Sequence, residues 1–91
     1  MTLLTRKDPM RRRRIFKSPT EVEVTAIEFF NESRRPQIVT VYRYRSQQAL
    51  FRIMIGPGVP AYWFGPIIAR SLVIEASPLV VVFARYSQRG L

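Results

Sequence analysis

A cluster of basic residues near the start of the chain has the composition of a phosphate-binding segment. Residues 11–14 are four consecutive arginines, and Ile15, Phe16 and Lys17 follow them. Each guanidinium is a planar donor that matches the oxygens of a phosphate and stacks on aromatic rings. We therefore predict that nucleic-acid phosphates are bound by Arg11, Arg12, Arg13, Arg14 and Lys17. The alternative is that the cluster is a solvated tail or a nuclear-import-like patch.

Aromatic and basic residues alternate in a second segment, VYRYRSQQALFR, at residues 41–52. On an extended strand, Tyr42 and Tyr44 share one face while Arg43 and Arg45 share the other. An aromatic face flanked by guanidinium groups is typical of sheets that stack bases. We predict that Tyr42 and Tyr44 stack on bases and that Arg43, Arg45 and Arg52 extend the phosphate track. The alternative is that both tyrosines cap the core and direct their hydroxyls to water.

Three consecutive aromatic residues, Tyr62, Trp63 and Phe64, lie in the Gly- and Pro-rich segment 56–66, which we predict to be a loop. Three adjacent rings on an extended loop do not all face one core. We predict that at least one of them anchors a binding partner. The alternative is that the loop folds over the core as a plug.

The residues that usually perform catalysis are scarce. The chain has no cysteine and no histidine, and Asp8 is its one aspartate. Glu21 and Glu23 alternate along a predicted strand, which is more typical of an exposed strand face than of a catalytic pair. No phosphate-binding glycine motif is present. We expect no enzymatic activity, no cofactor and no metal site.

Composition gives the strongest indication of a partner. The chain has 91 residues, of which 15 are Lys or Arg and 6 are Asp or Glu, so its net charge is +9; 47% of its residues are hydrophobic. This length allows one small folded domain. The positive charge favours nucleic acid as the partner, with an acidic protein or an anionic membrane surface as alternatives.

Charge also divides the chain into zones. Residues 1–17 hold seven basic side chains and one acidic side chain, whereas residues 18–32 hold four glutamates and no basic residue. We predict a flexible, disordered Arg-rich arm over residues 1–18 and a compact β-rich domain over residues 19–91.

Alternating apolar residues predict strands after this arm. The segments TEVEVTAIEFF, QIVTVYRYR, ALFRIMIG and LVVVFARYS are rich in β-branched and aromatic residues, and the first changes phase after Ala26. Residues 67–76 favour a further strand. Five strands in so short a chain predict an all-β fold, a small barrel or half-barrel on the scale of the OB or SH3 folds. The alternative is an α+β fold in which residues 66–76 are helical.

An uncharged segment, Ile53–Ala69, approaches the length of a membrane span but contains several glycines and prolines, so we predict no transmembrane helix. The sequence thus predicts a non-enzymatic protein that binds RNA or single-stranded DNA. A structural subunit of a larger complex, or a protein attached peripherally to an anionic membrane, is the alternative. We expect an intracellular location, in the cytoplasm or a nuclear-type compartment, with organelle import left open.

Overall fold

The computed structural model describes residues 10–88, and every regular element in that range is a β-strand. Alternation of apolar and polar residues, with many β-branched side chains, accounts for this choice. The strands are β1 (Arg11–Asn31), β2 (Gln37–Arg43), β3 (Ala49–Ile55), β4 (Ala61–Ala76) and β5 (Val80–Gln88).

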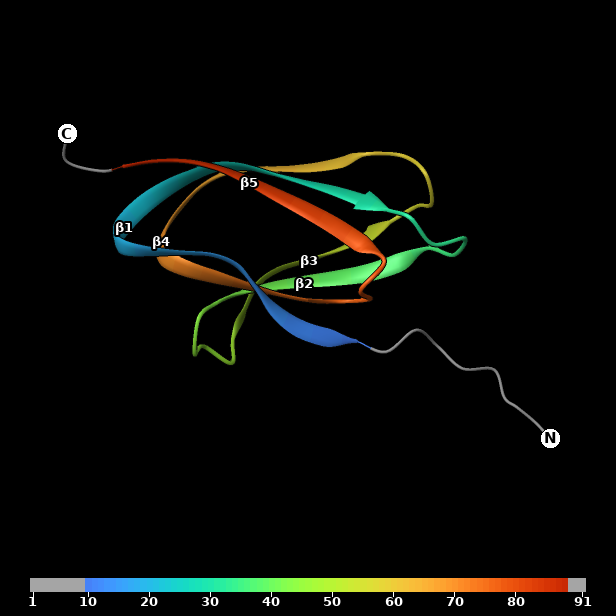
Figure 1. Cartoon of the computed structure of the whole chain (residues 1–91), viewed down its shortest axis with the longest axis horizontal. Coiled ribbons are helices and arrows are strands. Elements are labelled where there is room, and N and C mark those ends of the chain that lie inside the picture. Colours follow the sequence, from blue (N-terminus) through green and yellow to red (C-terminus); the bar gives the residue numbers. More distant parts are fainter. Residues whose placement is uncertain (1–9, 89–91) are drawn as a thin grey trace.

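The five strands form one antiparallel sheet in the order β3-β2-β4-β1-β5. The long strands β1 and β4 run through both halves of it. One half pairs the start of β1 with the end of β4 and then β2, while the other pairs the rest of β1 with the start of β4 and with β5. Figure 1 shows the sheet folded over, with β5 and the later part of β1 on one side and β2, β3 and the start of β1 on the other. The edge strands β3 and β5 are not paired with each other in the described range, so the sheet is not closed.

Strand β1 bends at residues 18–21. Its pairing with β4 passes from Lys17–Ser71 to Val22–Ala69, so four residues of β1 lie opposite Arg70 alone. Pro19 has no amide hydrogen to donate to a ladder, and such insertions bend a strand. The bend turns β1 from one half of the sheet into the other.

The core lies between the two halves of the folded sheet. All five strands contribute to it, and its fully buried side chains include Phe29, Ile27, Leu72 and Ile74. Burying each such side chain stabilises the fold by about 1.5 to 3 kcal/mol. The all-β prediction is confirmed, and the helical alternative for residues 66–76 is not supported, because those residues belong to β4.

The buried side chain of Asn31 joins the end of β1 to the end of β3. Its amide nitrogen donates to the carbonyl oxygens of Ile55 (2.9 Å) and Arg35 (2.6 Å), and its amide oxygen accepts from the Ser33 backbone nitrogen (2.9 Å). Phe29 of β1 also contacts Phe51 of β3 edge to face, with 6.3 Å between ring centroids. These contacts hold edge strand β3 against the opposite half of the sheet.

Two boundaries differ from the sequence prediction. Residues 11–18, predicted to be part of a flexible arm, form the first part of β1 and pair with β4. The predicted arm boundary at residue 18 therefore marks a bend in a strand; residues 1–9 lie outside the described range. The predicted loop 56–66 is also too long, because Ala61 already begins β4 by pairing with Phe29.

The predicted change of phase in the first strand is present. The register of β1 against both of its neighbours shifts between Val24 and Ala26. The inward-facing residues accordingly change from Val22 and Val24 to Ile27 and Phe29.

The part of the chain that the structure describes contains no helix that could span a membrane.

Candidate nucleic-acid interface

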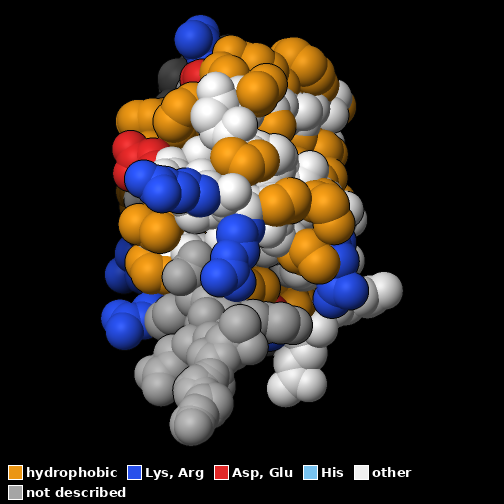
Figure 2. All heavy atoms as spheres, turned by 90° about the vertical axis from the view of Figure 1, so that its right-hand side faces the viewer, with side chains coloured by type: hydrophobic (Ala, Val, Ile, Leu, Met, Phe, Trp, Pro, Cys, Tyr) orange, Lys and Arg blue, Asp and Glu red, His pale blue; other side chains and the backbone are white. Residues whose placement is uncertain are grey.

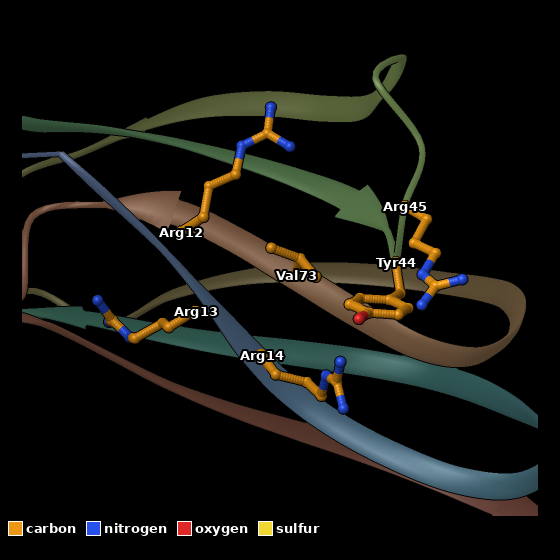
Figure 3. Close-up of a pocket in the computed structure, with 6 residues that line it drawn as sticks. All are labelled: Arg12, Arg13, Arg14, Tyr44, Arg45 and Val73. Atoms are coloured by element: carbon orange, nitrogen blue, oxygen red, sulfur yellow. The ribbon is translucent and has the colours of Figure 1, made fainter.

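Strand geometry separates the four consecutive arginines. Successive side chains on a strand point to opposite faces, so Arg12 and Arg14 lie on the outer face of the sheet. Arg13 extends away from them (Figure 3), and its guanidinium donates to the backbone oxygens of Ser77 and Val80 in the turn between β4 and β5. The prediction treated these arginines as one flexible cluster, whereas Arg13 binds the chain's own backbone.

Arg12 covers Tyr42. The Arg12 guanidinium lies 4.2 Å from the centre of the Tyr42 ring and 3.6 Å from a carboxylate oxygen of Glu75. The Tyr42 hydroxyl donates to the same carboxylate over 3.1 Å, and the Tyr42 side chain is buried. This ring is therefore closed to a stacking base. Its hydroxyl is bound to Glu75, whereas the alternative expected it to be directed to water.

Tyr44 has a different environment, because it is 44% exposed. The Arg14 guanidinium lies 4.0 Å from the Tyr44 ring centre and that of Arg45 lies 5.3 Å away. The sequence pattern predicted that Arg45 would face away from Tyr44. Arg45 has a φ of 67°, a left-handed backbone conformation just after β2, and this turns its side chain back over the ring.

These side chains line a groove with a volume of about 560 Å³, shown in Figure 3. Its apolar floor is Val73 of β4, and its walls are Arg12, Arg14, Tyr44 and Arg45. Arg13 also lines the groove, although its guanidinium is bound at the turn between β4 and β5. An apolar floor between aromatic and guanidinium walls suits a flat, partly polar group.

A second hollow, of about 400 Å³, lies on the other side of the Arg14–Tyr44 pair. It is lined by Arg14, Lys17, Ser18, Pro19, Tyr44, Arg45, Arg70 and Ser71. Four of these side chains are cationic and none is acidic. The bend in β1 produces this hollow, since Lys17 directly precedes the inserted residues, Ser18 and Pro19 are two of them, and Arg70 lies opposite them.

Electrostatics around Tyr44 favour negative charge. A hydrogen bond with Arg45, followed by the positive charges of Arg14 and Arg45, lowers the pKa of the Tyr44 hydroxyl from its ordinary value of 10.0. A site that stabilises a phenolate in this way also favours a phosphate.

Among residues 10–88, no three acidic side chains lie close enough together to hold a metal ion.

The other predicted basic residues lie away from the groove or at its margin. The Arg43 guanidinium donates to the backbone oxygen of Ile68 (3.2 Å), beside a third hollow of about 240 Å³ that also adjoins Tyr44. Arg52, on edge strand β3, donates to Thr40 (3.2 Å). Arg11 is exposed at the start of β1. None of these three lines the 560 Å³ groove.

Sequence reasoning missed Arg70, which lines two of the hollows. A signal for it exists, because the apolar alternation of β4 runs through Ile67 and Ala69 and then continues, out of phase, through Leu72 and Ile74. Such a change of phase marks an irregularity in a strand, and Arg70 lies at that point.

The aromatic triplet alternates across the sheet because it belongs to β4. Trp63 points inward, where its ring stacks on Phe51 at 4.9 Å and packs against the core. Tyr62 and Phe64 point outward, with exposed fractions of 53% and 71%. Trp63 therefore packs on the core as a strand residue and not as part of a plugging loop, while the other two rings are exposed.

No protein-family model, curated protein or solved structure matches this chain. The site is therefore interpreted from its own geometry.

Proposed function

We propose that this protein binds single-stranded nucleic acid, RNA or DNA, in the grooves around Tyr44. The observation that carries the proposal is the exposed Tyr44 ring, which lines two hollows and has the guanidinium groups of Arg14 and Arg45 at 4.0 and 5.3 Å from its centre. A base stacks on the aromatic and guanidinium surfaces of the larger groove. The cations of the second hollow, Arg14, Lys17, Arg45 and Arg70, bind the adjoining phosphates.

Single strands suit this site better than a duplex. Stacking on Tyr44 requires an unpaired base whose face is accessible. The described residues include no helix of the kind that enters a major groove. Contacts through stacking and phosphates predict binding with little sequence preference.

The test compares two double variants that lose the same charge. Arg14→Ala with Arg45→Ala removes both guanidinium groups from Tyr44, whereas Arg34→Ala with Arg35→Ala removes two exposed arginines that lie outside both hollows around Tyr44. The affinity for a fluorescent single-stranded oligonucleotide is measured by anisotropy over a range of salt concentrations. Thermal unfolding confirms that both variants are folded.

Each phosphate contact contributes about 0.7 to the slope of log affinity against log salt concentration for single strands. The Arg14 and Arg45 variant should therefore lose about 1.4 from the slope and bind more weakly, while the control pair keeps the slope of the original protein. Equal slopes for the two double variants would reject the proposal, as would failure of the original protein to bind.

A further inference from the structure

The outer face of the second half of the sheet carries exposed aromatic rings. Tyr62 of β4, Glu28 of β1 and Phe83 of β5 form one row across the strands, with Phe83 63% exposed. Phe64, Ala26 and Arg85 form the next row. In Figure 2, hydrophobic side chains cover much of the upper part of the molecule, and most of the Lys and Arg side chains in this view lie below them. The nucleic-acid proposal uses none of these rings.

This face ends at the unpaired edge of β5. Within residues 10–88, β5 pairs on one side with β1 and on its other side with no strand. Its sequence, VVVFARYSQ, has no proline and a single charge at Arg85. Edge strands usually carry charges, prolines or bulges that prevent pairing with another chain, and this edge has few of these features.

The charges near the two free edges of the sheet favour β5 over β3 as the edge that pairs with a second copy of this chain. The chain as a whole has a net charge of +9, so two copies repel each other over most of their surface. Next to β5, however, β1 contributes Glu23 and Glu28, which lie opposite Ser87 and Phe83. With Arg85, this region bears two negative charges and one positive charge. The other free edge, β3, adjoins the half of the sheet that holds Arg12 and Arg14, where a second copy would meet like charges.

We propose that β5 pairs antiparallel with β5 of a second copy of this chain. An antiparallel pair of identical strands has two-fold symmetry, so each contact occurs twice. Centred on Ala84, the pairing places Phe83 opposite Arg85 of the second copy on the outer face. This gives two Arg–aromatic contacts and keeps the two Arg85 side chains apart. The two aromatic faces then form one continuous surface, and the two grooves around Tyr44 belong to one particle.

Nuclease treatment and a high-salt wash first remove nucleic acid. The test is then the mass of the full chain in solution, measured by light scattering at low salt, where exposed charges are little screened. Nucleic acid is absent, so the result is independent of the function proposed above. The expected mass is twice the chain mass of 10.6 kDa. Phe83→Lys places like charges opposite each other and should halve the mass. Phe64→Lys, which changes a similarly exposed ring on β4 away from the edge, should leave the dimer intact.

A charge exchange tests the register. Adding Arg85→Glu to Phe83→Lys gives opposite charges at the paired positions and should restore the dimer. Circular dichroism on each variant establishes that the sheet is folded. A monomer for the original chain at every protein concentration overturns the proposal, and so does a dimer that persists in Phe83→Lys alone. A monomer whose β5 edge is bound instead by a different protein also overturns it.

Discussion

Tyr44 is exposed in the groove and lies next to two of its positive charges, those of Arg14 and Arg45. Its hydroxyl has a lowered pKa because Arg45 forms a hydrogen bond with it and because Arg14 and Arg45 are positively charged. A lowered pKa means that the folded protein favours the phenolate, so this stabilisation appears as pH rises through the Tyr44 pKa and disappears as pH falls below it. The phenolate then competes with nucleic-acid phosphates for the two guanidinium groups.

Affinity for a single-stranded oligonucleotide should therefore decrease as pH rises from neutral through the lowered Tyr44 pKa. In Tyr44→Phe this decrease should be absent, because phenylalanine keeps the ring and lacks the hydroxyl. Anisotropy titrations at constant ionic strength, from neutral to alkaline pH, measure the difference. The same loss of affinity in both proteins would show that another group is responsible.

Gly65 controls the packing of the aromatic segment at the level of a single atom. A Cβ at this position would lie 2.5 Å from the backbone oxygen of Val24 and 2.8 Å from the Trp63 ring. Because the nearest atom belongs to the backbone of β1, it cannot move aside cheaply. Gly65 also lies at the point where the register between β1 and β4 shifts, in the part of β4 that was predicted to be a loop.

Gly65→Ala should lower the free energy of unfolding by about 1 to 3 kcal/mol, as overpacking of a core does. Gly56→Ala is the matched control, since no atom lies within 4 Å of a Cβ built there. Urea denaturation of the two variants gives both values. If the two substitutions had equal effects, close packing at Gly65 would not be the cause.

At the scale of elements, alternation of apolar residues was sufficient to predict most of the sheet. The strands at residues 37–43, 49–55 and 80–88 follow β-branched and aromatic patterns. The first part of β1 lacks this pattern, because its four consecutive arginines show no alternation of apolar and polar residues. These residues become a strand because they pair with residues 71–76 of β4. The two segments are far apart in the sequence, so their pairing is not visible in the local pattern of either one.

The candidate site was predictable by residue type and less so by arrangement. Arg14, Lys17, Tyr44 and Arg45 were expected to bind nucleic acid, and the structure brings them around two adjoining hollows. The separation of Arg13 from Arg14 follows from strand alternation, which a disordered arm does not have. The position of Arg45 follows from a left-handed backbone conformation, and Arg70 from a bend shared by two strands; neither leaves a distinct motif.

The start of β1 is expected to be necessary for the fold. Removing residues 1–17 deletes the strand beside residues 71–76 and the half-buried side chains of Ile15 and Phe16. Phe16 also stacks on Tyr86 at 4.7 Å. The free energy of unfolding should fall by about 2 to 4 kcal/mol from lost burial alone.

Removing residues 1–9 is the control for this truncation, because it ends before β1. Chemical denaturation followed by far-ultraviolet circular dichroism compares the two shortened chains with the full chain. A chain starting at residue 18 that unfolds at the same denaturant concentration as the full chain would contradict the assignment of residues 11–17 to the sheet.

For the molecule as a whole, two different surfaces lie on the two halves of one folded sheet. The half built from β2, the end of β4 and the start of β1 holds the basic grooves around Tyr44. The half built from β5, the start of β4 and the rest of β1 holds the exposed rings of Tyr62, Phe64 and Phe83. The bend at residues 18–21 divides them, so one long strand serves both.

Nucleic-acid binding around Tyr44 is tested most directly by a map of the backbone amide signals, recorded by nuclear magnetic resonance while a single-stranded oligonucleotide is added. We expect the amide signals to change at residues 12–17, at Tyr44 and Arg45, and at Arg70 and Ser71. The amides of Phe64 and Phe83 should keep their positions. Changes centred on Phe64 and Phe83, or no changes at all, would contradict the assignment of nucleic-acid binding to the grooves around Tyr44.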